Sequence, residues 1–287
     1  MLSRLDSLRD RFYYSFAHYR RYAREIGSDW REVVARLKRF DVDLELARVL
    51  DVGCGTFYPY VILFHQVSAF ACGIDPMPIR RLGDGVGHES GSAPRWFLRT
   101  ARSRARDAYF RAAYYGELGR AAGVAIKRWD VNLCLGDAAA LPFPDNSFDV
   151  VVSRAAFEHI SDVQATVTNI ARVLRPGGIA DITIHLFTSL SGGHEREYWD
   201  FRRPRGRFVP WGHLRDPFWR PPMYLNRLGE NEYRNAFLAG LQIVSWLTDS
   251  VEGLDLVDET VLSALPGHTK DSLSKRMVTV VARKAGA

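Results

Sequence analysis

The sequence predicts an α/β fold built on a mostly parallel sheet. Apolar residues at 49–52 lead into Gly-Cys-Gly at 53–55 and then into a helical stretch, as a strand, a tight turn and a helix do. A second apolar stretch ends at Asp75, and residues 148–153 are apolar apart from Asp149 and Ser153. Continuous apolar runs of this length are typical of parallel strands buried on both faces. We therefore expect functional residues at the carboxyl edge of the sheet.

Glycines and a carboxylate follow the first two predicted strands. Gly53 and Gly55 bracket Cys54, and glycine is needed where a ligand lies against backbone. Asp75 comes 20 residues after Gly55, and a carboxylate at that distance can accept hydrogen bonds from both hydroxyls of a ribose. A nicotinamide-binding Gly-x-Gly-x-x-Gly motif would need glycine at position 58, where Tyr58 stands. The pattern therefore argues against a pyrophosphate at this turn.

Further motifs follow in a fixed order along the chain. They are Gly136-Asp137, Leu141-Pro142-Phe143, Ser147-Phe148-Asp149-Val150-Val151, Glu158-His159 and Leu174-Arg175-Pro176-Gly177-Gly178. With the glycine turn and Asp75, this set resembles the class I S-adenosylmethionine-dependent methyltransferases, most closely their small-molecule branch. The resemblance covers residues 47–185, is weaker over 80–128, and is weak in the C-terminal third. It implies a Rossmann-like, seven-stranded, mostly parallel sheet with helices on both faces, in one domain spanning 1–287.

The resemblance also implies S-adenosylmethionine as the cofactor and assigns residues to it. The turn and the acidic residue before it would hold the methionine end, the carboxylate after the second strand the ribose, and later positions the adenine and the amino group. The assigned residues are, in chain order, Asp51, Gly53, Cys54, Gly55, Asp75, Met77, Asp137, Ala138 and Ser153. Phe57 stands where this family usually has a third glycine, so its ring must tilt the loop or cover the pocket.

Residues 1–46 are expected to form an N-terminal helical cover made of two helices. The first, from about Ser7 to Arg24, carries aromatic residues spaced three or four apart, which places most of them on one face. Ser28 is expected to cap the second helix. Packing of this face on the core is the favoured interpretation. In the resembled family, leading helices also close over the cofactor, which would bring Tyr13, Tyr19 or Tyr22 to it.

Residues 80–128 form an insertion that carries the basic charge of the chain. This segment holds eleven Lys or Arg and four Asp or Glu, whereas the whole chain of 287 residues has a net charge of +6. A helix is expected from Trp96 to Arg120, with arginines interleaved among aromatic residues. A solvated arginine face on a packed helix is one interpretation. Contact of residues 95–115 with an acidic substrate, an anionic membrane surface or RNA is the other.

The segment 186–235 is expected to cap the acceptor substrate. It combines polar residues, arginines and aromatic residues after the fifth predicted strand, Ile179 to His185. A helix from Glu232 to Ala239 and strands at 241–247 and 277–283 complete the expected elements. Ser161 and Gln164 are expected to form a capping box for the helix that precedes the fifth strand.

Three histidines follow the fourth and fifth predicted strands and are the candidate catalytic bases: His159, His185 and His194. Histidine suits the removal of a proton from a hydroxyl near neutral pH. A structural or solvent-exposed role is as typical of each histidine taken alone. The spacing of His194, Glu195 and Asp200 matches no metal signature, and we expect no metal.

These observations predict a cytoplasmic methyltransferase, with peripheral membrane contact left open. The three cysteines lie in or beside predicted core elements, which favours a reducing compartment, and residues 1–12 show no apolar signal-peptide core. The favoured acceptor is a hydroxyl of a sugar, glycoconjugate or other polar small molecule. The alternatives are an RNA methyltransferase that uses the insertion, and a non-catalytic binding or scaffold protein with a degenerate cofactor pocket. The sequence leaves the oligomeric state open.

Overall fold

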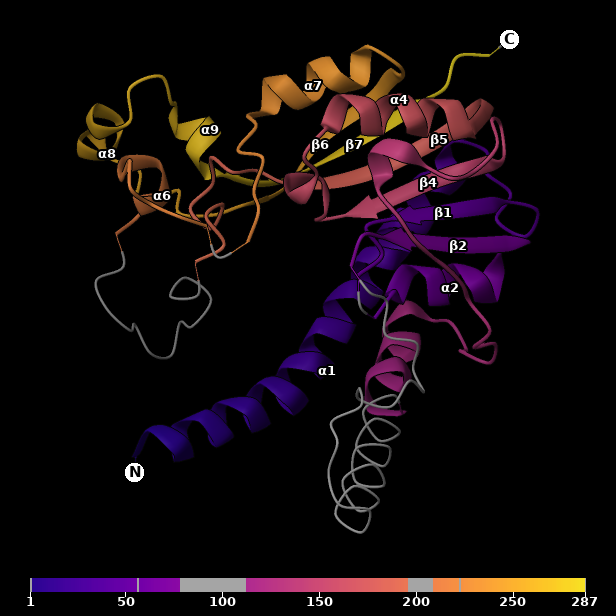
Figure 1. Cartoon of the computed structure of the whole chain (residues 1–287), viewed down its shortest axis with the longest axis horizontal. Helices are drawn as coiled ribbons and strands as arrows, with labels where there is room; N and C mark the ends of the chain where they lie inside the picture. Colours follow the sequence, from indigo (N-terminus) through magenta and orange to yellow (C-terminus); the bar gives the residue numbers. More distant parts are fainter. Residues whose placement is uncertain (1, 56, 78–111, 196–208, 222, 287) are drawn as a thin grey trace, which may run out of the picture. The chain divides into compact units, whose positions relative to one another are not determined.

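A seven-stranded mixed sheet organises the protein, as the computed structural model shows (Figure 1). The structure describes residues 2–55, 57–77, 112–195, 209–221 and 223–286, and for residues 2–19 only the backbone. The strand order is β3-β2-β1-β4-β5-β7-β6. β1 (Arg48–Val52) pairs in parallel with β4 (Phe148–Arg154), and β4 with β5 (Leu174–His185). β7 (Lys275–Arg283) runs antiparallel to β5 and to β6 (Gln242–Val251). The α/β, Rossmann-like prediction is confirmed.

The described residues fall into two compact units, Met1–Ala47 with Cys54–Leu135, and Arg48–Gly53 with Gly136–Ala287. The first unit holds α1 (Leu2–Arg39), α2 (Pro59–Val67), β2 (Phe70–Asp75), a helical stretch at 112–122, and β3 (Asn132–Leu135). β2 and β3 pair in parallel. α2 begins at Pro59, a residue that suits the first turn of a helix because its missing N–H would be unpaired there anyway. The prediction of one domain over the whole chain stays a prediction.

The N-terminal segment forms one continuous helix, so the prediction of two helices was wrong. Gly27 does not break α1; a Cβ at this position would lie 2.5 Å from the Cβ of Ala121. The glycine therefore allows α1 to approach the 112–122 helix closely. Ser28, the expected cap, lies inside α1, and the next residue, Asp29, accepts a hydrogen bond from the hydroxyl of Tyr60. Of the aromatic residues expected near the cofactor, Tyr22 is exposed, and the side chains of Tyr13 and Tyr19 lie outside the described residues.

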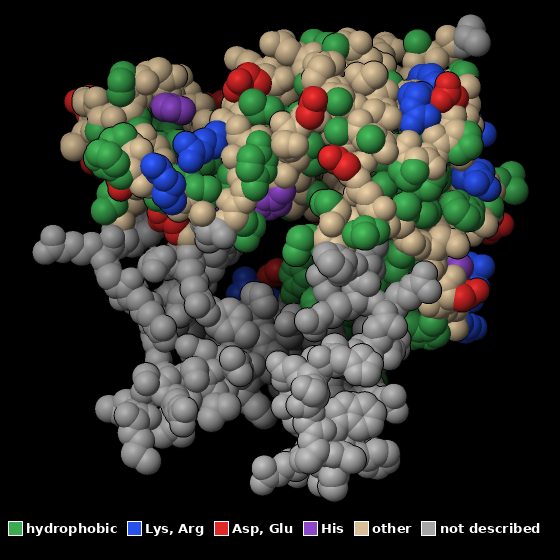
Figure 2. All heavy atoms as spheres, viewed as in Figure 1, with side chains coloured by type: hydrophobic (Ala, Val, Ile, Leu, Met, Phe, Trp, Pro, Cys, Tyr) green, Lys and Arg blue, Asp and Glu red, His purple; other side chains and the backbone are tan. Residues whose placement is uncertain are grey.

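The basic insertion is described only from residue 112 onward. In this part Tyr114, Tyr115 and Leu118 are fully buried. The described part of the helix therefore packs on the protein, as the interpretation of a packed helix predicts. Arg99 to Arg111 lie outside the described residues, and their role stays a prediction. On the face drawn in Figure 2, the Lys and Arg side chains that are described are interspersed with Asp and Glu. None of the described helices combines the length and the apolar character needed to cross a bilayer.

The second unit places short helices around its five strands. η1 (Ala138–Ala140) and η2 (Phe157–His159) are single turns, and α4 (Val163–Val173) lies beside α7 (Glu230–Leu238) (Figure 1). Asp162, not Ser161, caps α4: its Oδ1 accepts a hydrogen bond of 2.8 Å from the backbone N–H of Ala165. The predicted Ser161–Gln164 capping box was therefore wrong by one residue.

β5 begins earlier than predicted. Leu174 directly follows α4 and is already paired with Phe148, and the pairing resumes with Ile179 opposite Val150. The intervening Pro-Gly-Gly sequence lies in the irregular part of the ladder, where Gly177 has a φ of +79°. This backbone conformation favours glycine, which explains why the turn carries it. The Pro-Gly-Gly turn, expected to precede the strand, therefore lies within β5.

The C-terminal region builds a small second core in the same unit. α6 (Gly212–Arg215), α8 (Glu259–Ala264) and α9 (Lys270–Ser274) lie together in Figure 1. Trp211 is fully buried and donates a hydrogen bond of 3.3 Å from Nε1 to the carbonyl of Leu273. The buried residues of this cluster are Leu190, Trp211, Val257, Val261, Leu265 and Leu273. They anchor the loop that follows β5.

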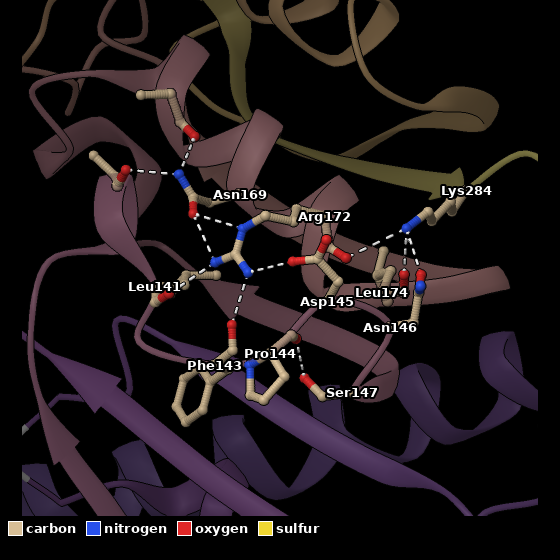
Figure 3. Close-up of polar contacts among 12 residues, drawn as sticks. Leu141, Phe143, Pro144, Asp145, Asn146, Ser147, Asn169, Arg172, Leu174 and Lys284 are labelled. Atoms are coloured by element: carbon tan, nitrogen blue, oxygen red, sulfur yellow. Dashed lines mark hydrogen bonds and ion pairs between the residues drawn. The ribbon is translucent and has the colours of Figure 1, made fainter.

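Arg172 on α4 holds the segment that follows η1. Its guanidinium donates to the carbonyls of Leu141 and Phe143, at 2.8 and 2.7 Å, and pairs with Asp145 at 2.8 Å (Figure 3). Asn169, one turn earlier on α4, accepts from the same guanidinium at 3.0 Å. The Leu-Pro-Phe motif is therefore fixed by an arginine that lies thirty residues further along the chain.

We predict that Arg172→Met lowers the free energy of unfolding by about 2–3 kcal/mol, because two carbonyls and a carboxylate lose a charged donor. Arg175→Met is the matched control, since Arg175 is well exposed and, among the described residues, pairs with Asp149. Its expected cost is at most about 1 kcal/mol. Urea unfolding measures both, and equal losses would contradict the bridging role of Arg172.

Candidate active site

The glycine turn is tied to the end of β2 by backbone donors. The N–H of Cys54 donates to the carbonyl of Ile74 at 3.2 Å, and the N–H of Gly55 donates to Oδ2 of Asp75 at 2.9 Å. Oδ1 of Asp75 accepts from the N–H of Met77 at 2.8 Å. Asp75 is buried, so these two hydrogen bonds to backbone fix the orientation of its carboxylate. The predicted ribose ligand therefore also holds the turn.

One side of Gly55 faces open space. Its φ is +67°, and a Cβ built on it would meet no atom of the described residues within 4 Å. By contrast, a Cβ on Gly73 would lie 2.8 Å from the Sγ of Cys54, so Gly73 and Cys54 pack tightly. Backbone exposed beside a fixed carboxylate is what a nucleoside ligand needs. The residues of the turn therefore fit the predicted cofactor, although Met77 is 67% exposed.

Phe57 packs against two tyrosines. Its ring lies 5.6 Å from the ring of Tyr114, and its carbonyl accepts a hydrogen bond of 2.8 Å from the hydroxyl of Tyr115. Both tyrosines belong to the 112–122 helix. The helix thus accommodates the ring that replaces the usual third glycine. Phe57 was predicted either to tilt the loop or to cover the pocket. These contacts give no support to a covered pocket.

The second unit holds the other residues assigned to the cofactor. Asp51 is buried in β1, and Gly53 follows that strand with a φ of +73°. Asp137 is exposed, and its Oδ1 accepts from the N–H of Ala139 at 2.9 Å. Ala138 is buried in η1. Ser153 is buried near the end of β4, and its Oγ has no hydrogen-bond partner among the described residues. A buried hydroxyl of this kind is suited to a polar ligand.

The three predicted histidines meet at one edge of the sheet. His159 lies in η2 after β4, His185 ends β5, and His194 lies in the loop beyond it. The rings of His185 and His194 stack with centroids 4.8 Å apart, and the ring of His159 meets His194 edge-on at 5.0 Å. The structure therefore brings together all three residues that the sequence singled out as candidate bases.

Hydrogen bonds determine which nitrogen of His159 carries the proton. Its Nδ1 lies 2.8 Å from the carbonyl oxygen of Tyr224, which can only accept. Nδ1 is therefore the donor, and the lone pair of neutral His159 is on Nε2. Asn226 fixes the same segment, because its Nδ2 donates to the carbonyls of Phe157 and Ile160 at 2.7 and 3.0 Å. Two residues from the predicted cap thus orient the candidate base.

A serine and a carboxylate orient His185. Oγ of Ser191 lies 2.6 Å from Oε1 of Glu252 and 2.9 Å from Nε2 of His185. The hydroxyl has one proton, which it donates to the carboxylate, so it accepts from Nε2–H of His185. The lone pair of His185 is therefore on Nδ1, which lies 3.1 Å from Nε2 of His194.

Glu158 completes this cluster. It is 2% exposed, and neither carboxylate oxygen has a hydrogen-bond partner among the described residues. Burial raises the pKa of its carboxyl to about 8, although the backbone amides of Glu158 and His185 act in the opposite direction. Burial also lowers the pKa of His185 to about 2 and that of His194 to about 4, helped by the charges of neighbouring residues. Glu158, His185 and His194 are therefore held in their neutral forms near pH 7.

Comparison with known proteins identifies the fold family. Residues 82–182 match the family model described as "Methyltransferase domain". Over these residues the chain carries a methyltransferase domain. S-adenosylmethionine is the cofactor of such methyltransferases, and in the first unit the glycine turn beside the carboxylate of Asp75 fits it. The match begins after Asp75, so the roles assigned to residues 51–77 rest on their geometry and on the motifs.

Curated relatives match short segments of this chain. Malonyl-[acyl-carrier protein] O-methyltransferase 1 of Coxiella burnetii is 36% identical over 76 residues, 24% of this chain and 27% of the relative. The ubiquinone/menaquinone biosynthesis C-methyltransferase UbiE of Shewanella halifaxensis is 41% identical over 49 residues, 17% and 20% of the two chains. The aligned segments thus span less than a third of these relatives. A solved S-adenosylmethionine-dependent methyltransferase from Mesorhizobium loti is 14% identical, with a TM-score of 0.48 over 87% of this chain and 96% of that one.

Several residues of the site were missed by sequence reasoning. Glu158 is predicted only as part of a motif, Ser191 and Asn226 only as members of the substrate cap, and Glu252 has no predicted role. The adjacency of Glu158 to His159 was a usable signal, since a carboxylate beside a candidate base follows the same strand. Glu252 carries no such signal in the sequence, because it lies 61 residues from Ser191 and contacts it only in the folded chain.

We predict that Glu158→Gln stabilises the methyltransferase domain increasingly as the pH rises. Between about pH 4.5 and 8, folded Glu158 keeps a proton that the unfolded chain has lost. The wild type therefore loses stability across this window, whereas glutamine does not titrate. The variant should gain about 2–4 kcal/mol relative to wild type between pH 4.5 and 8.5. Urea unfolding with EDTA present measures this, and the exposed Glu259→Gln is the control. Parallel pH profiles for Glu158→Gln and wild type would contradict the burial of an unpaired carboxyl.

Proposed function

We propose that this chain transfers a methyl group from S-adenosylmethionine to a hydroxyl of a sugar, glycoconjugate or other polar small molecule. The observation that carries the proposal is the convergence of His159, His185 and His194 after β4 and β5, with the lone pair of His159 on Nε2. The relatives do not decide the acceptor, since their names include both O- and C-methyltransferases. The histidines favour oxygen, because a hydroxyl has to lose a proton when it is methylated.

The cofactor supplies a methyl group made electrophilic by the positive charge on sulfur. The protein has to align the acceptor oxygen with that methyl group, exclude water and receive the hydroxyl proton. His159 is the proposed base, since it is half-buried rather than fully buried and its Nδ1–H donates to the carbonyl of Tyr224. Accepting a proton at Nε2 leaves this hydrogen bond intact. The tautomer needed for catalysis is therefore already set by the fold.

The described part of the cap supports a polar acceptor. The rings of Phe187 and Trp219 lie 5.9 Å apart, and the guanidinium of Arg227 lies 5.8 and 5.5 Å from their centroids. Glu195 accepts a hydrogen bond of 2.6 Å from Nε1 of Trp219. Aromatic faces beside a carboxylate and a guanidinium suit a ligand that carries both apolar ring faces and hydroxyls. This combination is the second support for a sugar-like acceptor.

We predict that Asp75→Ala weakens S-adenosylmethionine binding by about 1.5–3 kcal/mol, the value of lost charged hydrogen bonds. Asp75→Asn should bind with intermediate affinity, because an amide oxygen can still accept from the N–H of Gly55. Calorimetric titration with S-adenosylmethionine and S-adenosylhomocysteine measures both. Unchanged affinity in Asp75→Ala would remove Asp75 from the cofactor site. No binding by the wild type would favour the scaffold hypothesis.

We predict that His159→Gln lowers kcat by about 10²–10⁴-fold with any hydroxyl acceptor found in a screen, while S-adenosylmethionine affinity stays the same. Glutamine can keep the hydrogen bond to Tyr224 but cannot act as a base near neutral pH. The assay is the release of S-adenosylhomocysteine, and His268→Gln, outside the cluster, is the control. A fall in activity equal to that of the control would show that methyl transfer proceeds without this base.

A further inference from the structure

We propose that Glu158, His185 and His194 bind a divalent transition-metal cation at the carboxyl ends of β4 and β5. Each residue offers one ligand atom, and these atoms all lie within 4.8 Å of one another. The sequence interpretation expected no metal, having considered His194 only with Glu195 and Asp200. In the structure Glu195 contacts Trp219, and Asp200 lies outside the described residues. The new set arises because η2 and the end of β5 lie beside the loop that carries His194.

The two histidine nitrogens already have the spacing of ligands to one ion. Nδ1 of His185 lies 3.1 Å from Nε2 of His194. Two nitrogens each about 2.1 Å from a shared cation lie about 3.0–3.4 Å apart, from octahedral to tetrahedral angles. Without an ion, Nε2 of His194 must donate to Nδ1 of His185. With an ion bound to Nε2, neutral His194 carries its proton on Nδ1 instead. This change of tautomer leaves the number of protons on the His194 ring the same.

Glu158 has the environment of a ligand that lacks its ion. Both oxygens are buried and have no hydrogen-bond partner among the described residues, which is costly for any carboxyl group. A cation would remove that cost by binding the carboxylate directly and displacing to solvent the proton that the buried carboxyl holds near pH 7. The largest separation, 4.8 Å, exceeds that of ligands on one ion, so the carboxylate has to move toward the imidazoles when the cation binds.

The residues behind His185 form the outer support that metal sites need. Nε2–H of His185 donates to Ser191, whose hydroxyl donates to Glu252. Oε2 of Glu252 lies 3.7 Å from Nε of Arg276, and Oε1 also accepts from the N–H of Ser191 at 2.7 Å. A ligating histidine characteristically donates its other N–H to such a chain, which fixes the ring and the lone pair. Because Nε2–H of His185 donates to Ser191, the lone pair of this ring is on Nδ1, the nitrogen that faces His194.

The ligand set indicates which cations fit. Two imidazoles and one carboxylate suit Mn²⁺, Fe²⁺, Co²⁺ and Zn²⁺, whereas Mg²⁺ prefers oxygen ligands and several waters. Three protein ligands leave positions open, and a hydroxyl bound there would lose its proton more readily. His159, edge-on to His194, would then lie beside the activated oxygen. This catalytic role rests on the proposed function, but cation binding does not.

The experiment uses the full chain without an affinity tag, stripped with EDTA and titrated with Co²⁺, Zn²⁺ and Mg²⁺ in the absence of S-adenosylmethionine. We expect one equivalent of Co²⁺ or Zn²⁺ to bind, visible for Co²⁺ as d–d absorption, and to raise Tm by several degrees. Mg²⁺ should bind at least 100-fold more weakly. Glu158→Gln should have a metal-free Tm at or above that of the wild type, as predicted above, and lose at least 100-fold in Co²⁺ affinity. Ser191→Ala should lose about 10–100-fold.

His268→Gln is the matched control and should bind Co²⁺ as the wild type does. The inference is overturned if the stripped wild type shows no stoichiometric Co²⁺ or Zn²⁺ binding, or if Glu158→Gln binds Co²⁺ unchanged. Preferential Mg²⁺ binding would also overturn it. Because no readout involves the cofactor or an acceptor, failure here leaves the proposed methyl transfer standing. Conversely, metal binding without methyl transfer would overturn the proposed function alone.

Discussion

The parallel pairing of β4 with β5 is the constraint on which the site depends. Because the two strands run in the same direction, the residues that follow them leave the sheet at the same edge. Glu158 and His159 follow β4, and His185 ends β5. Successive turns then fold the next loop back, with the N–H of Gly192 bonded to the carbonyl of Ser189 and that of His194 to Ser191. These turns return His194 to the ring of His185.

Burial gives this cluster its chemical character. A carboxyl and two imidazoles removed from water favour their neutral forms, so lone pairs rather than charges are presented at pH 7. The hydrogen bonds from His159 to Tyr224 and from His185 to Ser191 then decide where each lone pair lies. The same arrangement serves a proton acceptor or a metal ligand. In either case the reactive nitrogen is fixed by a partner on its opposite side.

The sequence predicts those features that depend on short stretches of chain. Continuous apolar runs locate the buried strands, and the position of the histidines after two of them predicts that they lie at the carboxyl edge of the sheet. The sequence does not predict features that depend on contacts between residues far apart in the chain. Gly27 looks like a helix break, but it allows contact with Ala121, and Glu252 reaches Ser191 only in the folded chain. A loop made of several turns has no periodicity to detect, so the approach of His194 to His185 was not predictable in detail.

The tautomers of the histidine rings test the account most directly. Long-range ¹H–¹⁵N correlation spectra at pH 7.5, with EDTA present, report which ring nitrogen is protonated. The account predicts a proton on Nδ1 of His159 and on Nε2 of His185, with His185 still neutral at pH 5 because burial lowers its pKa to about 2. A proton on Nε2 of His159, or a His185 ring that titrates near its ordinary pKa of about 6.5, would contradict it.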